Sequence, residues 1–111
     1  MSRRTDKVAS LLQHEVGDFI HRLEMPALTT ISKVEVTPDL KWSKIWITIL
    51  GNEAKQTEVI KILMRSSRDL QKNLKSKMTM KFVPRVKFEV DHGEEYAAKI
   101  NELLRKAQQD E

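Results

Sequence analysis

Apolar residues recur every three or four positions near the start of the chain. They are Val8, Leu11, Leu12, Val16, Phe19, Ile20 and Leu23. This spacing places the side chains on one stripe of a helix with 3.6 residues per turn. Pro26 follows shortly after the stripe, at a point where a helix does not easily continue. The pattern predicts a first helix over about 4–23.

Three later stretches alternate apolar and polar residues, as half-buried strands do. They are residues 33–36, 45–49 and 86–90. Thr37-Pro38-Asp39 supplies turn chemistry between the first two stretches, Gly51-Asn52 ends the second, and Pro84 precedes the third. We therefore expect three strands, the first two joined by a tight turn.

Two more amphipathic stretches complete the chain, at 53–78 and 96–107. The first stretch has a helical period, but Ser66 and Ser67, two small polar residues, stand where this period predicts apolar ones. We therefore predict two helices with a kink between them. The order is helix, strand, strand, helix, kink, helix, strand, helix. It predicts a single α+β domain with its helices on one face of a small sheet, in the type II KH-like topology.

An ordinary KH domain holds the nucleic acid backbone at a Gly-x-x-Gly turn between its paired helices. The only glycines here are Gly17, Gly51 and Gly93, and none lies near Ser66-Ser67. The chain keeps the expected scaffold and lacks the Gly-x-x-Gly loop.

Charge is unevenly distributed along the chain. Residues 61–87 hold nine basic residues and one acid, Asp69, whereas 1–60 hold eight of each and 88–111 hold three basic and seven acidic residues. A block of Lys and Arg gains affinity for nucleic acid by displacing its condensed counterions. A solvated lysine-rich helix face would give the same composition, so the cluster alone leaves both interpretations open.

The residues expected to contact RNA phosphates fall into three groups. Arg65, Arg68, Lys72 and Lys75 lie three or four positions apart and so project from one face of the paired helices. Lys77, Lys81 and Arg85 extend this stripe through the next loop, and Arg3 and Arg4, with Lys7, form a basic arm at the start of the first helix. Such contacts position RNA and read few bases.

Other candidate sites have simpler explanations. Trp42, Lys44 and Trp46 share one strand face and are suited to stacking on bases, although such indoles more often only cover a sheet. His14, Asp18 and His21 share a helix face, yet residues of these types usually face water, so we expect no metal site. The chain has no cysteine, no phosphate loop, and no histidine close in sequence to Ser66 or Ser67. We expect no enzyme activity and no cofactor.

Three segments together resemble the ribosome-binding factor A family. They are Val34-Glu-Val-Thr-Pro-Asp-Leu40, Ile45-Trp-Ile-Thr-Ile-Leu-Gly51 and Val83-Pro-Arg-Val-Lys-Phe-Glu-Val-Asp91, and the resemblance runs from about Arg4 to Leu104. That family resembles KH proteins but replaces the Gly-x-x-Gly turn by a helix, kink, helix unit, usually with Ala-x-Gly at the kink. Ser66-Ser67-Arg68 stands at those positions here, so the kink glycine is missing.

The resemblance implies a non-enzymatic assembly factor that binds the small ribosomal subunit and its ribosomal RNA during late maturation and rRNA processing, and that aids growth in the cold. We expect a cytoplasmic monomer with no membrane association, a domain over 4–105, and flexible termini at 1–3 and 106–111. The alternative is a protein-interaction module whose basic block docks an acidic partner.

Overall fold

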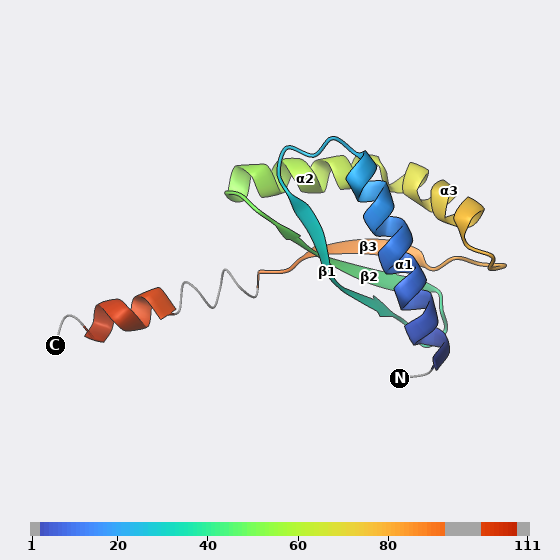
Figure 1. Cartoon of the computed structure of the whole chain (residues 1–111), viewed down its shortest axis with the longest axis horizontal. Helices are drawn as coiled ribbons and strands as arrows, with labels where there is room; N and C mark the ends of the chain where they lie inside the picture. The colour runs from blue at the N-terminus through green and yellow to red at the C-terminus, as the bar shows by residue number, and fades with distance from the viewer. Residues whose placement is uncertain (1–2, 93–100, 109–111) are drawn as a thin grey trace.

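The structure, a computed structural model, describes residues 3–92 and 101–108. Its elements run in the order α1 (Arg3–Arg22), β1 (Thr29–Val36), β2 (Trp42–Ile49), α2 (Glu53–Arg65), α3 (Ser67–Lys77) and β3 (Arg85–Val90), as Figure 1 shows. Residues 101–108 are also helical, while 96–100, the first part of the predicted last helix, lie outside the described residues. The predicted α+β fold class is confirmed.

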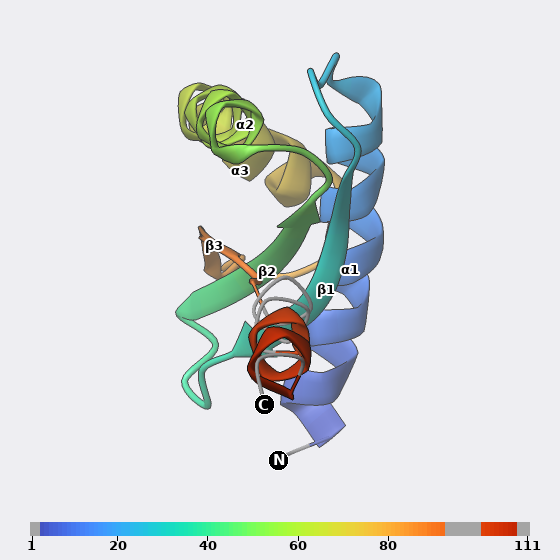
Figure 2. The same cartoon turned by 90° about the vertical axis from the view of Figure 1, so that its left-hand side faces the viewer.

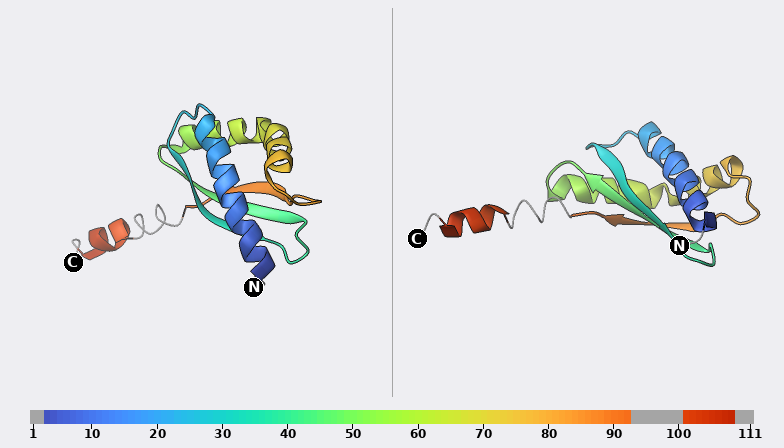
Figure 3. Two further views of the ribbon diagram at one scale, coloured as in Figure 1. Left: turned by 45° about the vertical axis from the view of Figure 1, so that its right-hand side comes forward. Right: turned by 60° about the horizontal axis from the view of Figure 1, so that its bottom comes forward.

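The three strands form one sheet in the order β1-β2-β3. β1 and β2 are antiparallel neighbours joined by a short turn, whereas β2 and β3 are parallel. A parallel pair needs a long crossover connection, and α2 with α3 provides it, as the two views of Figure 3 show. Helices α1, α2 and α3 all lie on the same face of the sheet (Figure 2).

The core fills the space between this helical layer and the sheet. α1 contributes four buried apolar side chains at helical spacing, and β2 contributes three at alternating positions. The buried apolar set is Val8, Leu12, Val16, Ile20, Ile45, Ile47, Ile49, Val59, Leu63, Leu70, Leu74 and Met78. These side chains form one cluster, in which the isoleucines of the central strand β2 are buried together with residues of α1, α2 and α3.

β1 begins at Thr29, earlier than the alternation at 33–36 predicts. The pairing register shifts between Ile31, opposite Ile47, and Lys33, opposite Trp46, so Ser32 is an extra residue in the strand. Such a bulge puts two residues an odd number of positions apart on the same face. Ile31 and Val34 therefore both pack against the core. The predicted start of this strand was wrong, because the bulge interrupts the alternation of apolar and polar residues.

Glycine is required at one junction, between β2 and α2. Gly51 has φ +148°, and a Cβ added there would lie 3.1 Å from the Cβ of Lys55. The next residue, Asn52, caps α2, since its side-chain oxygen accepts a 2.9 Å hydrogen bond from the Lys55 amide. This junction fixes where α2 begins and thus the direction of its basic face.

The interruption between α2 and α3 falls at Ser66, whose φ of −88° and ψ of −1° are right-handed. Its amide donates to the Ile62 carbonyl at 3.0 Å, and its carbonyl accepts from the Leu70 amide at 2.8 Å. Among the described non-glycine residues only Leu40 has a positive φ. Arg68 lies inside α3, so this break needs no glycine at the position where the family resemblance predicts one.

Candidate RNA-binding surface

The α2–α3 pair has an apolar side and a basic side. Leu63, Leu70 and Leu74 are buried toward the sheet. Arg65, Arg68, Lys72 and Lys75, which we call the basic stripe, are all exposed. With 3.6 residues per turn, the stripe positions project on the side of the helices opposite those leucines. The same periodicity that buries the leucines therefore turns the four cations outward.

The stripe has no acidic partners within the part of the chain that the structure describes. The ion pairs found there, at distances up to 4.0 Å, join His14 to Asp18 and three lysines to glutamates. None of them includes a stripe residue. Asp69 lies on the first turn of α3 beside the stripe but is in none of these ion pairs. The four cations therefore remain available to an anionic ligand.

The positive charge continues from the end of α3 to the start of β3, where Lys77, Lys81 in the connecting loop, and Arg85 are exposed. The end of this loop is anchored on two sides. Gln71 Nε2 donates to the Pro84 carbonyl at 3.0 Å, and the Arg85 amide donates to the Lys41 carbonyl at 2.9 Å. Arg85 is therefore held at the start of β3.

The structure also brings together two basic groups that are far apart in sequence. Arg4 on α1 and Lys81 in the α3–β3 loop line one groove of about 900 Å³. Lys7 and Lys41 add charge to it, and Leu11, 45% exposed, lines the same groove. Arg3 begins α1 but does not line the groove. Sequence reasoning missed Lys41, because only the fold places the β1–β2 turn beside α1.

One carboxylate, Asp39, also lines this groove. The Thr37 hydroxyl donates to its Oδ1 at 2.6 Å, and the Lys41 amide donates to the same atom at 3.0 Å. These two hydrogen bonds hold the pKa of Asp39 below its ordinary value. Asp39 thus organises the β1–β2 turn, and the other charged residues lining the groove are cations.

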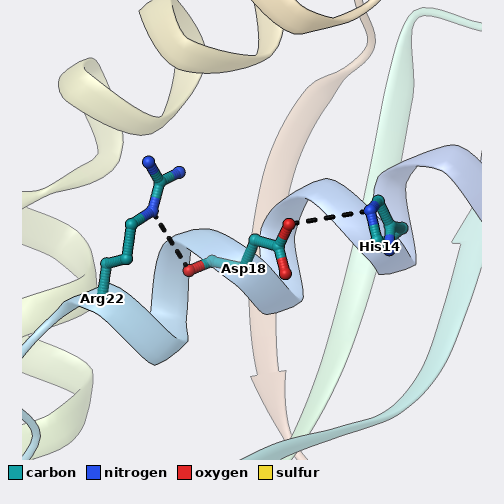
Figure 4. A network of polar contacts seen from close by, with 3 residues as sticks. All are labelled: His14, Asp18 and Arg22. Atoms are coloured by element: carbon teal, nitrogen blue, oxygen red, sulfur yellow. Dashed lines mark hydrogen bonds and ion pairs between the residues drawn. The ribbon is translucent and has the colours of Figure 1, made fainter.

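The polar face of α1, unlike the basic stripe, combines a histidine and an arginine that each contact the same aspartate (Figure 4). His14 Nε2 lies 3.6 Å from Asp18 Oδ2, and Arg22 Nε donates to the Asp18 carbonyl oxygen at 3.4 Å. Arg22 thus bonds the backbone and not the carboxylate of Asp18, and His21 belongs to neither contact. No cluster of three metal-ligating side chains occurs in residues 3–92 and 101–108.

The chain combines a KH-like α+β scaffold that lacks the Gly-x-x-Gly turn with an exposed basic stripe on its helix pair, and so belongs to the KH-like class of folds. The sequence profile of ribosome-binding factor A matches residues 4–104. The chain belongs to the ribosome-binding factor A family. This family consists of ribosome-binding factors and not of enzymes, and the expectation of a non-enzymatic protein is confirmed on that ground.

Curated relatives extend over nearly the whole chain. The ribosome-binding factor A of Chlorobium phaeovibrioides is 38% identical over 110 residues, which cover 95% of this chain and 92% of that protein. The Staphylococcus carnosus factor is 33% identical over 104 residues, covering 91% and 90%. The sequence resemblance to this family is thereby confirmed.

Solved structures show the same fold. The crystal structure of ribosome-binding factor A from Thermus thermophilus superposes with a TM-score of 0.68 at 22% identity, over 78% of this chain and 93% of that one. A homology model of the Thermus thermophilus factor, fitted into a cryo-EM map of its complex with the 30S subunit, gives 0.66 at 22% identity, over 77% and 92%. Within the described part of this chain, no helix combines the length and apolarity that crossing a membrane requires.

Proposed function

We propose that this protein is a cytoplasmic assembly factor that binds the small ribosomal subunit through its ribosomal RNA during late maturation and rRNA processing, and that aids growth in the cold. The proposed RNA-binding domain is residues 4–105. The observation that carries the proposal is the basic stripe, four exposed cations without acidic partners on a helix pair of a ribosome-binding factor. The 30S complex of the related Thermus thermophilus factor supports the choice of subunit.

The chemistry proposed for the stripe is phosphate binding. Arg65 and Arg68 offer planar guanidinium groups that can donate two hydrogen bonds to one phosphate, whereas Lys72 and Lys75 act as point charges. Three further cations extend the row of proposed phosphate contacts beyond the stripe: Lys77, Lys81 and Arg85. Arg3 and Arg4, at the start of α1, are proposed to bind phosphates as well. Contacts of this kind fix position and orientation, so recognition depends on the shape of folded RNA.

The test is co-sedimentation of the protein with isolated small subunits, complete ribosomes and naked ribosomal RNA across a salt series. The proposal predicts binding to free small subunits that persists at moderate salt and fails on complete ribosomes. Log affinity should fall linearly with log salt, as expected when phosphate counterions are released. Equal binding to every RNA that vanishes with salt would contradict the assembly role. A shallow salt dependence without competition by RNA would favour an acidic protein partner instead.

A further inference from the structure

The sheet face opposite the helices carries both tryptophans of the chain. Trp42, Lys44 and Trp46 alternate along β2 with buried residues such as Ile45 and Ile47 and therefore share the outer face, as the sequence predicts. α1, α2 and α3 lie on the other side of the sheet (Figure 2). Trp42 remains 50% exposed. The outer face thus presents aromatic surface that these three helices do not cover.

Each indole has a cation beside it. The Arg85 guanidinium lies 5.8 Å from the centroid of Trp42, and the Lys44 ammonium lies 5.3 Å from that of Trp46. Trp46 is also fixed in orientation, because its Nε1 donates a 3.1 Å hydrogen bond to Glu35 Oε1. The Trp46 ring is therefore held in position before any ligand arrives, which reduces the entropy lost on binding.

Two lysines face one another on this surface. Lys44 and Lys87 are register partners in the parallel β2–β3 pair, and like charges directly opposite each other destabilise a sheet. Glu35 pairs with Lys33 at 2.9 Å, and Glu89 lies 3.9 Å from Lys87. With Arg85, the face carries more cations than carboxylates. Trp42, Lys44 and Lys87 line one hollow of about 640 Å³, which is also lined by Glu35, the register partner of Lys44 on β1. Because Glu35 already pairs with Lys33, an anion in the hollow would still relieve the repulsion between the two lysines.

We infer that this outer sheet face is a second RNA site, which takes an unpaired stretch of the RNA bound by the basic stripe. A phosphate lies between Lys44 and Lys87, and an adjacent base stacks on the exposed part of Trp42 beside Arg85. The inference rests on the proposed function and extends it from folded RNA to a single strand. RNA fits better than an acidic peptide, because a nucleotide supplies both an anion for the lysines and a planar base that stacks on the indole. The carboxylates of an acidic peptide would pair with the lysines but would not stack on the indole.

The location of both tryptophans provides a direct assay, since tryptophan fluorescence, excited where the single tyrosine does not absorb, reports on this face. Titration with a single-stranded oligouridine of about 12 nucleotides should quench the emission. Lys44→Gln with Lys87→Gln should weaken binding about tenfold and make the slope of log affinity against log salt shallower by about 0.7 per lost phosphate contact. Because the variant removes a like-charge pair, its melting temperature should not fall. Trp42→Leu should also weaken binding about tenfold.

The matched control is Lys55→Gln with Lys106→Gln, which removes the same charge from two exposed positions outside the sheet and should bind as the parent does. The inference is overturned if oligouridine fails to quench, if the Lys44–Lys87 variant binds unchanged, or if polyglutamate quenches as strongly as RNA.

Co-sedimentation with small subunits distinguishes the proposed function from the second RNA site. Loss of subunit binding by a basic-stripe variant that still shows oligouridine quenching would support two distinct sites, whereas failure of the parent protein to bind subunits would contradict only the proposed function.

Discussion

The Ser43 hydroxyl donates a 3.0 Å hydrogen bond to the backbone carbonyl of Arg85, joining β2 to the start of β3. Ser43 is a buried polar residue, only 3% exposed, at a point where the β2 alternation would otherwise place an apolar side chain. Together with the 2.9 Å hydrogen bond from the Arg85 amide to Lys41, it fixes the backbone of a proposed RNA contact from both sides.

Ser43→Ala removes this bond from a buried site, so we expect the free energy of unfolding to fall by about 1 kcal/mol. Urea denaturation followed by far-UV circular dichroism measures the change. Ser76→Ala is the matched control, because Ser76 is exposed on α3 and its hydroxyl only donates to the Asn73 carbonyl of the same helix. Equal stability of the two variants would show that the Ser43 bond does not hold β3.

Arg68 stands where the resemblance to the family leads one to expect a kink glycine, yet here it is an ordinary residue of α3. Arg68→Gly should therefore destabilise the protein by about 0.5–1 kcal/mol relative to Arg68→Ala, since glycine loses more backbone freedom in a helix. Both variants lose the same guanidinium and should lose the same RNA affinity. Thermal melts and binding titrations of the pair separate the two effects; a more stable glycine variant would indicate strain at the break.

Glu35 provides a pH-dependent prediction. Its pKa lies below the ordinary value of 4.5, chiefly because Lys33 donates to the carboxylate, with Trp46 as the second donor. A lowered folded-state pKa means that this group's stabilising contribution is present above the unfolded pKa and is lost as the pH falls through the folded one. By carboxyl NMR, Glu35 should titrate lower in the folded than in the urea-unfolded protein.

Lys33→Gln removes the largest cause of that lowered pKa, so the Glu35 titration midpoint should rise. The Asp39 midpoint should remain unchanged, because its pKa is lowered by the Thr37 hydroxyl and the Lys41 amide instead. If both midpoints moved together, the cause would be the general field of the protein and not the local ion pair.

Hydrophobic periodicity predicted the α+β order, the core face of β2 and the outward direction of the basic stripe, because burial alone determines those features. It did not predict the early start of β1, where the Ser32 bulge hides Ile31 from a strict alternation. Nor did it predict the positive φ of 61° at Leu40 in the β1–β2 turn. The proximity of Arg4 and Lys81 in one groove, and the register of Lys44 with Lys87, depend on tertiary structure, which a one-dimensional pattern does not contain.

The basic stripe is tested most directly by small-subunit co-sedimentation of two variants with equal net charge. One variant replaces Arg65, Arg68, Lys72 and Lys75 with glutamine. The control replaces Arg22, Lys55, Arg105 and Lys106, again two arginines and two lysines, all exposed and outside the stripe. Both should fold, since all eight side chains are exposed.

The stripe variant should lose at least tenfold in affinity, and its slope of log affinity against log salt should become shallower by about 3, at roughly 0.7–0.9 for each phosphate contact removed. The control should bind nearly as the parent does. Parental binding by the stripe variant, or an equal loss in both variants, would contradict the claim that this helix face binds ribosomal RNA.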